Sequence, residues 1–336
     1  MDRLSPPAFF AQPGWLPIRA WRADDAWRFD WAWFDRQPLD APFFRDSVED
    51  ALRLPFNQAL RPSCTPEALA AGDWPAVPLT ALVYHASRCG STLIAQMLAS
   101  QPSHAVYAEA MPIDQLLRAR YRDPGWSEAE QVTALRQLAR AYGRPRRGSE
   151  RAMVFKLDAW SVAEAGLLRA AFPGVPALFV YRDPVEIVVS HLHQPGVHTV
   201  PGVNGPSPLW DDLPVTLPRA EYIARVIGRI LAAGLAECRA GTMRPLAYPA
   251  LPQAIWGELA PVFELGAAAR DALAIAGQRN AKRPDETFRA DSADKQAAAD
   301  PALLELVERW AGEPYRALEA LRGGANGGNR QVAGLP

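Results

Sequence analysis

The first seventy-six residues have a pattern of their own. Six of the eleven tryptophans lie in this stretch, and apolar and polar residues partly alternate between Ala26 and Phe34. Such alternation is typical of a strand with one buried face. Residues 42–54 have the spacing of a short helix. We expect residues 1–76 to form an aromatic-rich N-terminal accessory region, in which the tryptophans serve packing rather than a carbohydrate platform.

From residue 78 onward, short apolar runs alternate with helical patterns. Three of these runs have the length and composition of buried parallel strands. They are residues 79–85, 151–157 and 177–181. A helical segment follows each run. This succession predicts an α/β fold with a mainly parallel central sheet and helices on both faces, in three layers.

Capping residues and breaks mark the predicted helix boundaries. Ser127 and Ser161 each precede a glutamate by three residues and predict helix starts through capping boxes. Other helices are expected at 91–100, 219–239, 302–310 and 314–321, the last two separated by a break at Gly312. Residues 194–218 are rich in proline and glycine, which is typical of a binding loop. The main domain would span residues 77–322, followed by a disordered tail at 323–336.

The charge balance and the cysteines exclude several classes of protein. The formal net charge is −1, which argues against a dedicated nucleic-acid binder. Cys64, Cys89 and Cys238 are far apart, which fits a reducing compartment and argues against a structural zinc. There is no signal-peptide pattern and no apolar run near the ~18 residues of a membrane span. We therefore expect a cytoplasmic protein without an integral membrane segment.

The most informative segment is residues 82–93. It predicts a strand, a tight loop and a helix start, where backbone N–H groups and the helix dipole can hold a phosphate group. Gly90 would let the backbone approach the anion closely, and Ser91 and Thr92 would add hydroxyl donors. Aligned with Gly-x-x-x-x-Gly-Lys-Ser/Thr, the chain has Ser91 in place of the lysine that reaches a γ-phosphate. Arg88 would supply positive charge instead, which fits a donor without a γ-phosphate.

A second anion site is indicated at residues 181–190. Asp183 is a typical N-cap, a proline follows it, and Glu186 would close a capping box. Arg182 immediately precedes this helix, and Ser190 lies about two turns further along the same face. A guanidinium and a hydroxyl in these positions could clamp one phosphate.

Together the two motifs resemble those of sulfotransferases that use 3′-phosphoadenosine-5′-phosphosulfate (PAPS). Residues 87–93 are similar to the family's 5′-phosphosulfate-binding loop, with Cys89 where serine is usual, and Arg182 and Ser190 have the family's spacing for the 3′-phosphate. The resemblance covers roughly residues 78–300 and is strongest to tyrosylprotein-type and bacterial members. It implies a P-loop NTPase-like fold, PAPS as co-substrate, adenosine 3′,5′-bisphosphate as product, and no metal.

The resemblance also implies roles for individual residues. The 5′-phosphosulfate would be held by Arg88, Cys89, Gly90, Ser91 and Thr92. The 3′-phosphate would be held by Arg182 and Ser190. Many family members close the nucleotide site with a late basic loop, whose counterpart here would include Lys295. That match is loose, because the glycine of the family's Arg-Lys-Gly is absent, and a solvated charge run explains these residues equally well.

Sulfuryl transfer needs a base for the acceptor proton and a cation at the leaving phosphate. Glu109 follows Arg88 by 21 residues and resembles, in that offset, the catalytic glutamate of tyrosylprotein sulfotransferases. A solvated loop glutamate is the alternative interpretation. Lys156 ends a strand expected beside the β-strand of the phosphate segment, and it is one of only three lysines. It would stabilise the leaving oxygen, unless it is an ordinary strand-end lysine.

Other interpretations stay open. His191, His193 and His198 are alternative bases, although each is more readily a capping or loop histidine. Asp183 at a strand end could be a magnesium ligand of an ATP-dependent small-molecule kinase, but the missing lysine counts against this. A non-catalytic nucleotide-binding protein is the third alternative. The acceptor could be a small molecule, sugar, lipid or peptide with a hydroxyl or amine.

Overall fold

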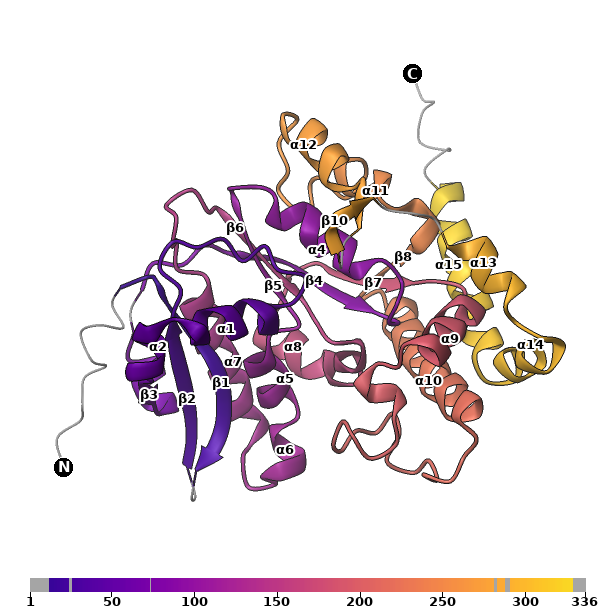
Figure 1. The fold of residues 1–336 in the computed structure, drawn as a ribbon, viewed down its shortest axis with the longest axis horizontal. Helices are drawn as coiled ribbons and strands as arrows, with labels where there is room; N and C mark the ends of the chain where they lie inside the picture. Colours follow the sequence, from indigo (N-terminus) through magenta and orange to yellow (C-terminus); the bar gives the residue numbers. More distant parts are fainter. Residues whose placement is uncertain (1–11, 24–25, 73, 281–282, 288–290, 329–336) are drawn as a thin grey trace. The chain divides into compact units, whose positions relative to one another are not determined.

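Strands and helices alternate along the described part of the computed structural model, which comprises residues 12–23, 26–72, 74–280, 283–287 and 291–328 (Figure 1). The strands are β1 (Trp15–Ala23), β2 (Ala26–Trp33), β3 (Ser63–Cys64), β4 (Leu79–His85), β5 (His104–Ala108), β6 (Ala152–Lys156), β7 (Ala177–Tyr181), β8 (Arg244–Ala247), β9 (Arg279–Asn280) and β10 (Arg283–Thr287). The α-helices are α1 (Phe44–Arg53), α2 (Pro55–Ala59), α3 (Pro66–Ala70), α4 (Ser91–Ala99), α5 (Met111–Leu117), α6 (Ala119–Arg122), α7 (Glu128–Tyr142), α8 (Ala165–Ala171), α9 (Pro184–His193), α10 (Arg219–Arg239), α11 (Gln253–Trp256), α12 (Ala269–Ala276), α13 (Ser292–Ala297), α14 (Pro301–Val307) and α15 (Glu313–Gly328). Short 3-10 helices are η2 (Ala159–Glu164), η3 (Val197–Thr199) and η4 (Tyr248–Ala250), and η5 (Glu308–Gly312) is a π-helical turn.

Five strands form a parallel central sheet in the order β5-β6-β4-β7-β8, flanked by helices. β5 runs parallel to β6 with Ala108 opposite Lys156, and β7 runs parallel to β8 with Tyr181 opposite Ala247. The inner strands β6, β4 and β7 are the predicted apolar runs, and their side chains are almost all buried. The predicted α/β class with a mainly parallel sheet is therefore confirmed. The strand order reverses around β4, and open α/β sheets bind ligands at such a switch point.

The chain forms two compact units. Unit 1 contains the described residues of Met1–Leu82, Thr92–Pro176 and Pro252–Phe288. Unit 2 contains those of Val83–Ser91, Ala177–Leu251 and Arg289–Pro336. This division differs from the boundaries after residues 76 and 322 that the sequence suggests. Those boundaries, which delimit the main domain, stay a prediction.

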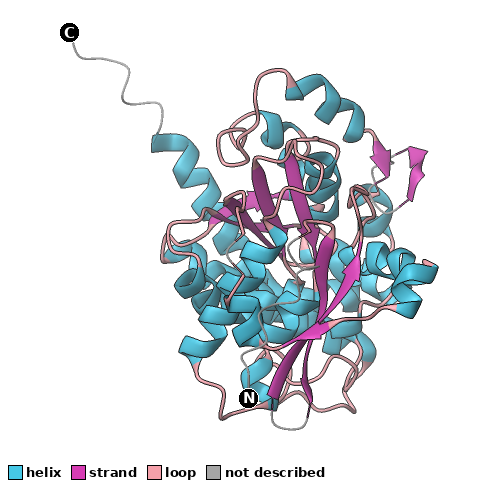
Figure 2. Cartoon of the chain, turned by 90° about the vertical axis from the view of Figure 1, so that its left-hand side faces the viewer, coloured by secondary structure: helices cyan, strands magenta, loops and turns pink. Residues whose placement is uncertain are grey.

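The aromatic N-terminal region is built into unit 1. β1 and β2 form an antiparallel hairpin (Figure 2), and β3 pairs with β2 through Ser63 and Cys64. The hydroxyl of Tyr142 on α7 donates to the Pro17 carbonyl at 2.8 Å, and Gln115 on α5 accepts from the Ala20 N–H at 2.7 Å. Trp31 is only 1% exposed. The aromatic side chains of this region thus share a core with the helices that follow.

Unit 2 gathers most of the later helices. α10 packs against α9, α14 and α15, and α9 also contacts α13 and α14 (Figure 1). The buried side chains of α10 include Ile223, Ile227, Ile230 and Leu231, whose spacing of three and four residues gives the helix one apolar face. This face explains why the helix predicted at 219–239 forms with those bounds.

Two predicted boundaries are wrong. Ser161 does not start a helix through a capping box, because it lies inside η2, and Glu164 accepts instead from the hydroxyl of Tyr121 at 2.5 Å. Gly312 does not break the late helices, because η5 carries the chain continuously from α14 into α15. α15 extends to Gly328, and the tail predicted at 323–336 stays a prediction. Residues 329–336 lie outside the described residues.

Candidate active site

The loop between β4 and α4 (residues 86–90) has a strained backbone. Ser87 and Arg88 have positive φ angles of 66° and 48°, and Gly90 has a φ angle of 88°. Residues other than glycine seldom adopt this left-handed conformation, so two in succession indicate a backbone that its surroundings hold in place. α4 begins directly afterwards with Ser91 and Thr92, which are both buried. Such a helix start offers N–H groups and a favourable dipole to an anion.

Buried histidines hold the first half of the β4–α4 loop. The Ser87 N–H donates to Nδ1 of His85 at 3.0 Å, and Ser87 Oγ lies 3.0 Å from Nε2 of His191. Nδ1 of His191 accepts from the Gly196 N–H at 3.1 Å. The proton of the neutral ring therefore belongs on Nε2, which donates to Ser87. His191 supports the loop through this contact.

Arg88 and Cys89 point to different partners. Nη2 of Arg88 donates to the Gln194 carbonyl at 2.8 Å, just after α9. The Cys89 side chain is fully buried, and its Sγ donates to the Val180 carbonyl of β7 at 3.1 Å. Cys89 can therefore contribute to anion binding only through its backbone N–H.

Gly90 lies where no side chain fits. A Cβ atom would come within 2.8 Å of Leu251 Cδ1 and 2.9 Å of Tyr248 Cδ2. The Tyr248 ring also lies against the Arg182 guanidinium, whose Cζ is 4.1 Å from the ring centroid. One aromatic ring thus contacts both the β4–α4 loop and the arginine predicted to hold the 3′-phosphate.

Arg182 is buried, and its guanidinium faces the β4–α4 loop. Nη1 lies 3.5 Å from the Arg88 carbonyl. Nε pairs with Glu186, and Nη2 donates to Asp291 Oδ1 at 2.8 Å and to Ser292 Oγ at 2.9 Å. Burial acts to lower the pKa of Arg182, but the hydrogen bond to Asp291 and the charge of Glu186 outweigh it and raise this pKa.

Lys295 meets Arg182 at the same carboxylate. Nζ of Lys295 lies 2.7 Å from Oδ2 of Asp291, while Arg182 holds Oδ1. Burial acts to raise the pKa of Asp291, but the hydrogen bonds from Lys295 and Arg182 outweigh it and lower this pKa below 3.8. Two predicted cofactor-binding cations from distant parts of the sequence therefore converge in unit 2.

One detail of the second motif differs from the prediction. Asp183 caps α9, accepting from the N–H two residues on at 2.8 Å, but Glu186 does not close a capping box. Its carboxylate is taken by Arg182 and by the Ser292 hydroxyl. Within the described residues, no hydrogen bond joins the half-buried Ser190 to Arg182. A shared role of Ser190 and Arg182 in binding one phosphate stays a prediction.

Glu109 and Lys156 form an ion pair in unit 1. The Glu109 N–H donates to the Lys156 carbonyl at 2.7 Å, and its carboxylate pairs with Lys156 Nζ. The Lys156 side chain is 2% exposed and its Nζ lies 5.3 Å from the Phe43 ring centroid, whereas the Glu109 side chain is 25% exposed. Glu109 also has a positive φ angle of 52°. A solvent-reachable carboxylate in a strained conformation, fixed by a buried ammonium, has the features of a proton acceptor.

Three polar residues near these groups escaped the sequence patterns. Asp158 follows β6, and burial together with the charge of Glu109 raises its pKa well above 3.8. Tyr248 follows β8, an edge strand of four residues that the apolar pattern misses. Asp291 has no local signal, because its partner Arg182 lies more than a hundred residues away. Only Asp158 had a usable clue, as an acid two residues after a strand-end lysine.

The remaining histidines have structural partners. His198 is buried, and its ring packs edge-on against His191 with the centroids 5.1 Å apart. His193 is exposed, and its Nδ1 donates to the Val189 carbonyl at 2.9 Å. These contacts give the three histidines of the α9 region structural partners. Glu109 stays the predicted base, and the histidines stay the alternatives.

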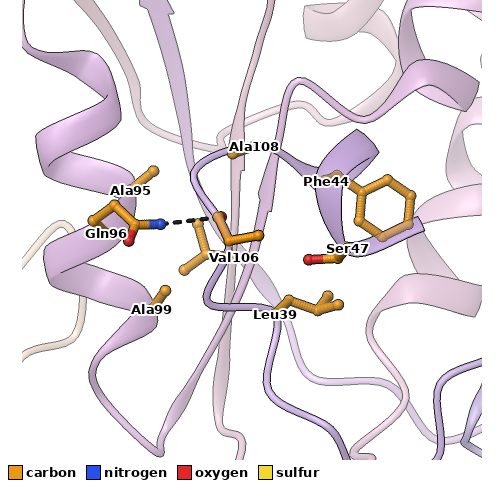
Figure 3. Close-up of a pocket in the computed structure, with 9 residues that line it drawn as sticks. Leu39, Phe44, Ser47, Ala95, Gln96, Ala99, Val106 and Ala108 are labelled. Atoms are coloured by element: carbon orange, nitrogen blue, oxygen red, sulfur yellow. Dashed lines mark hydrogen bonds between the residues drawn. The ribbon is translucent and has the colours of Figure 1, made fainter. Parts of the chain in front are cut away.

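A small cavity in unit 1 is too small for an acceptor (Figure 3). It lies between α1, α4 and β5 and is lined by Leu39, Ala41, Phe44, Ser47, Ala95, Gln96, Ala99, Val106 and Ala108. Nε2 of Gln96 donates to the Ala41 carbonyl at 3.0 Å, the dashed line in Figure 3. The cavity volume of about 10 Å³ leaves room for no more than one water molecule.

Two features are absent from the part of the chain that the structure describes. No group of three or more His, Cys, Asp or Glu side chains there is arranged to hold a metal ion. No helix in that part of the chain combines the length and the apolar character needed to cross a membrane. The thiols of Cys64, Cys89 and Cys238 are buried and form no disulfide among the described residues.

Similar solved structures are sulfotransferase domains. No family model and no curated protein matches the chain. The sulfotransferase domain from the curacin biosynthetic pathway is 13% identical, with a TM-score of 0.43, over 74% of this chain and 99% of that one. The domain from the Synechococcus PCC 7002 olefin synthase is 16% identical, with a TM-score of 0.38, over 75% and 97%. Sulfotransferase STF9 from Mycobacterium avium is 13% identical, with a TM-score of 0.40, over 71% and 77%. With TM-scores below 0.5, what this molecule does must be inferred from its own residues.

Proposed function

We propose that this chain transfers a sulfuryl group from PAPS to a hydroxyl or amine of an acceptor. The observation that carries the proposal is the contact between the Arg182 guanidinium and the β4–α4 loop in unit 2. The two motifs were expected to bind opposite ends of one doubly phosphorylated adenosine, which requires them to be neighbours. Tyr248, packed against Gly90 and Arg182, supports the same assignment.

The loop would bind the 5′-phosphosulfate. Its N–H groups and the start of α4 suit an anion, and Arg88 adds a positive charge. The Gln194 carbonyl, which holds Arg88, begins the segment 194–218. That connection supports a role of this segment in binding the acceptor next to the sulfuryl group. The class of acceptor and the cytoplasmic location remain predictions from the sequence.

Glu109 and Lys156 would carry the transfer itself. The acceptor oxygen or nitrogen attacks sulfur, the bond between sulfur and the phosphate oxygen breaks, and the acceptor proton passes to Glu109. A protonated Glu109 no longer neutralises Lys156, whose ammonium then stabilises the negative charge on the leaving phosphate. The observed ion pair supports this coupling, because it makes one proton transfer change the charge available to the leaving group.

Calorimetry with adenosine 3′,5′-bisphosphate tests the nucleotide site. We expect binding without magnesium, and we expect Arg182→Ala to weaken the bisphosphate by roughly tenfold or more, at about 1.5–3 kcal/mol per charged hydrogen bond. Adenosine 5′-monophosphate should be affected much less. Arg239→Ala, an exposed arginine of unit 2, is the matched control. Equal losses for both nucleotides would remove the 3′-phosphate role, and binding of ATP that needs magnesium would favour a kinase.

Transfer from sulfur-labelled PAPS to panels of phenols, sugars, lipids and peptides tests the reaction. Glu109→Gln should lower the rate by about 10²–10⁴-fold while keeping bisphosphate affinity, since it removes only the base. Bisphosphate binding with no transfer to any acceptor class, in the wild-type protein, would instead indicate a non-catalytic nucleotide-binding protein.

A further inference from the structure

We propose that Asp291 is a specificity-determining residue that competes with the 3′-phosphate for Arg182 and Lys295. This inference rests on the proposed function. Its carboxylate lies between two cations, with Oδ1 at 2.8 Å from Arg182 Nη2 and Oδ2 at 2.7 Å from Lys295 Nζ. A phosphate group would use the same two donors in the same way. Asp291 therefore stands where the second anion of the nucleotide is expected.

The two carboxylates around Arg182 are held very differently. Glu186 has a side chain only 10% exposed, pairs with Nε of Arg182, and accepts from Ser292 Oγ at 3.0 Å and Gln296 Nε2 at 3.4 Å. The Asp291 side chain is 47% exposed. Glu186 is thus the fixed counter-ion of the arginine, and Asp291 is the one that a ligand in solvent can displace.

The side chain of Asp291 does not cap the helix that follows it. Asp291 is the N-cap residue of α13, where an aspartate usually accepts from a backbone N–H. Its side chain makes no capping hydrogen bond. Among the described residues, only the two cations hold the carboxylate, so its displacement does not require α13 to lose a cap.

The charges define what the 3′-phosphate meets. Arg182 and Lys295 supply two positive charges, and Glu186 and Asp291 supply two negative charges, so these four side chains are neutral together. A phosphate that enters beside Asp291 meets a like charge within hydrogen-bond reach of its own donors. When the Asp291 side chain turns into solvent, the phosphate site gains a net positive charge. Arg182 Nη2 and Lys295 Nζ are then available to the phosphate. The ion pairs of Asp291 with Arg182 and Lys295 therefore lower the affinity for a 3′-phosphate, because the phosphate must displace them.

Asp291→Asn keeps the shape of the side chain and removes its charge. We expect it to strengthen the binding of adenosine 3′,5′-bisphosphate by about tenfold, equivalent to ~1.4 kcal/mol. The affinity for adenosine 5′-monophosphate should change much less, because this nucleotide has no 3′-phosphate to compete with Asp291 for Arg182 and Lys295. Asp294→Asn removes the same charge from an exposed position of the same helix and should leave both affinities unchanged.

Isothermal titration of the full chain with both nucleotides separates the outcomes. A selective gain for the bisphosphate in Asp291→Asn and Asp291→Ala, absent in Asp294→Asn, supports the proposal. Unchanged or weaker bisphosphate binding in folded Asp291 variants overturns it, while wild-type preference for the bisphosphate leaves the proposed function standing. If the wild-type protein binds neither nucleotide, both proposals fall. Thermal unfolding of each variant confirms that a lost affinity is not a lost fold.

Discussion

Replacing Ser87 with alanine would remove the hydroxyl that joins the β4–α4 loop to His191. Both residues are buried, and Nε2 of His191 lies 3.0 Å from Ser87 Oγ. Nδ1 of the same ring accepts from the Gly196 N–H, so Nε2 carries the proton in the neutral ring. The variant therefore takes away the acceptor of a buried N–H group.

The magnitude follows from this burial. An intramolecular hydrogen bond contributes about 1 kcal/mol net, and a buried donor left without its acceptor costs about 1–3 kcal/mol. We therefore expect Ser87→Ala to lower the free energy of unfolding by about 1–3 kcal/mol. The same hydrogen bond helps to hold Ser87 at its φ angle of 66°, so its loss also loosens a strained backbone. The affinity of the loop for an anion should fall with it.

Urea unfolding followed by tryptophan fluorescence measures this change. His193→Leu, an exposed histidine of the same helix, should shift stability by less than about 0.5 kcal/mol. The double variant Ser87→Ala, His191→Leu closes a thermodynamic cycle, in which we expect a coupling energy of about 1 kcal/mol. Additive effects of the two substitutions would refute the reasoning, because they would mean that the hydroxyl and the ring act independently.

Two further predictions concern a glycine and a histidine. Gly90→Ala places a methyl group 2.9 Å from a Tyr248 ring carbon at a φ angle of 88°. This substitution should lower the free energy of unfolding by about 1–3 kcal/mol and weaken bisphosphate binding. Gly148→Ala, at a φ angle of 81° with no atom within contact distance of the added methyl group, is the control for backbone strain alone. Equal losses of stability in the two variants would exclude the steric effect. Burial lowers the pKa of His104 from 6.5, and its Nε2 lies 2.6 Å from the Phe263 carbonyl. The stability that this neutral ring contributes is present above pH 6.5 and is lost as the pH falls through the lowered pKa, so His104→Gln should flatten the acid side of a plot of urea midpoint against pH; an unchanged slope would contradict this.

Features set by neighbouring residues could be predicted from the sequence. The strand, turn and helix around Gly90 follow from a local apolar run, a glycine and polar helix-starting residues, and β4 and α4 form there. The N-cap at Asp183 is equally local and is present. In contrast, the apolar pattern did not single out the edge strands β5 and β8, because β5 begins with His104 and β8 begins with Arg244 and Pro245, which leaves each with a very short apolar run.

Features set by distant partners could not be predicted. Glu164 sits at the third position of an apparent capping box, yet its carboxylate accepts from the hydroxyl of Tyr121, which lies 43 residues away in the sequence. The counter-ion Asp291 escaped prediction for the same reason, since only the folded chain brings it to Arg182.

The way the backbone is shared between the two units limits how the protein can be divided. The chain alternates between them in six stretches, and only Val83–Ser91 of unit 2 precedes residue 177. A fragment starting at Ala177 would keep Arg182 and Lys295 but would lack the β4–α4 loop, which Arg182 contacts. Neither unit can be obtained by cutting the gene once, so shortened forms made for crystallisation or for mapping of binding should trim the termini and leave the interior whole.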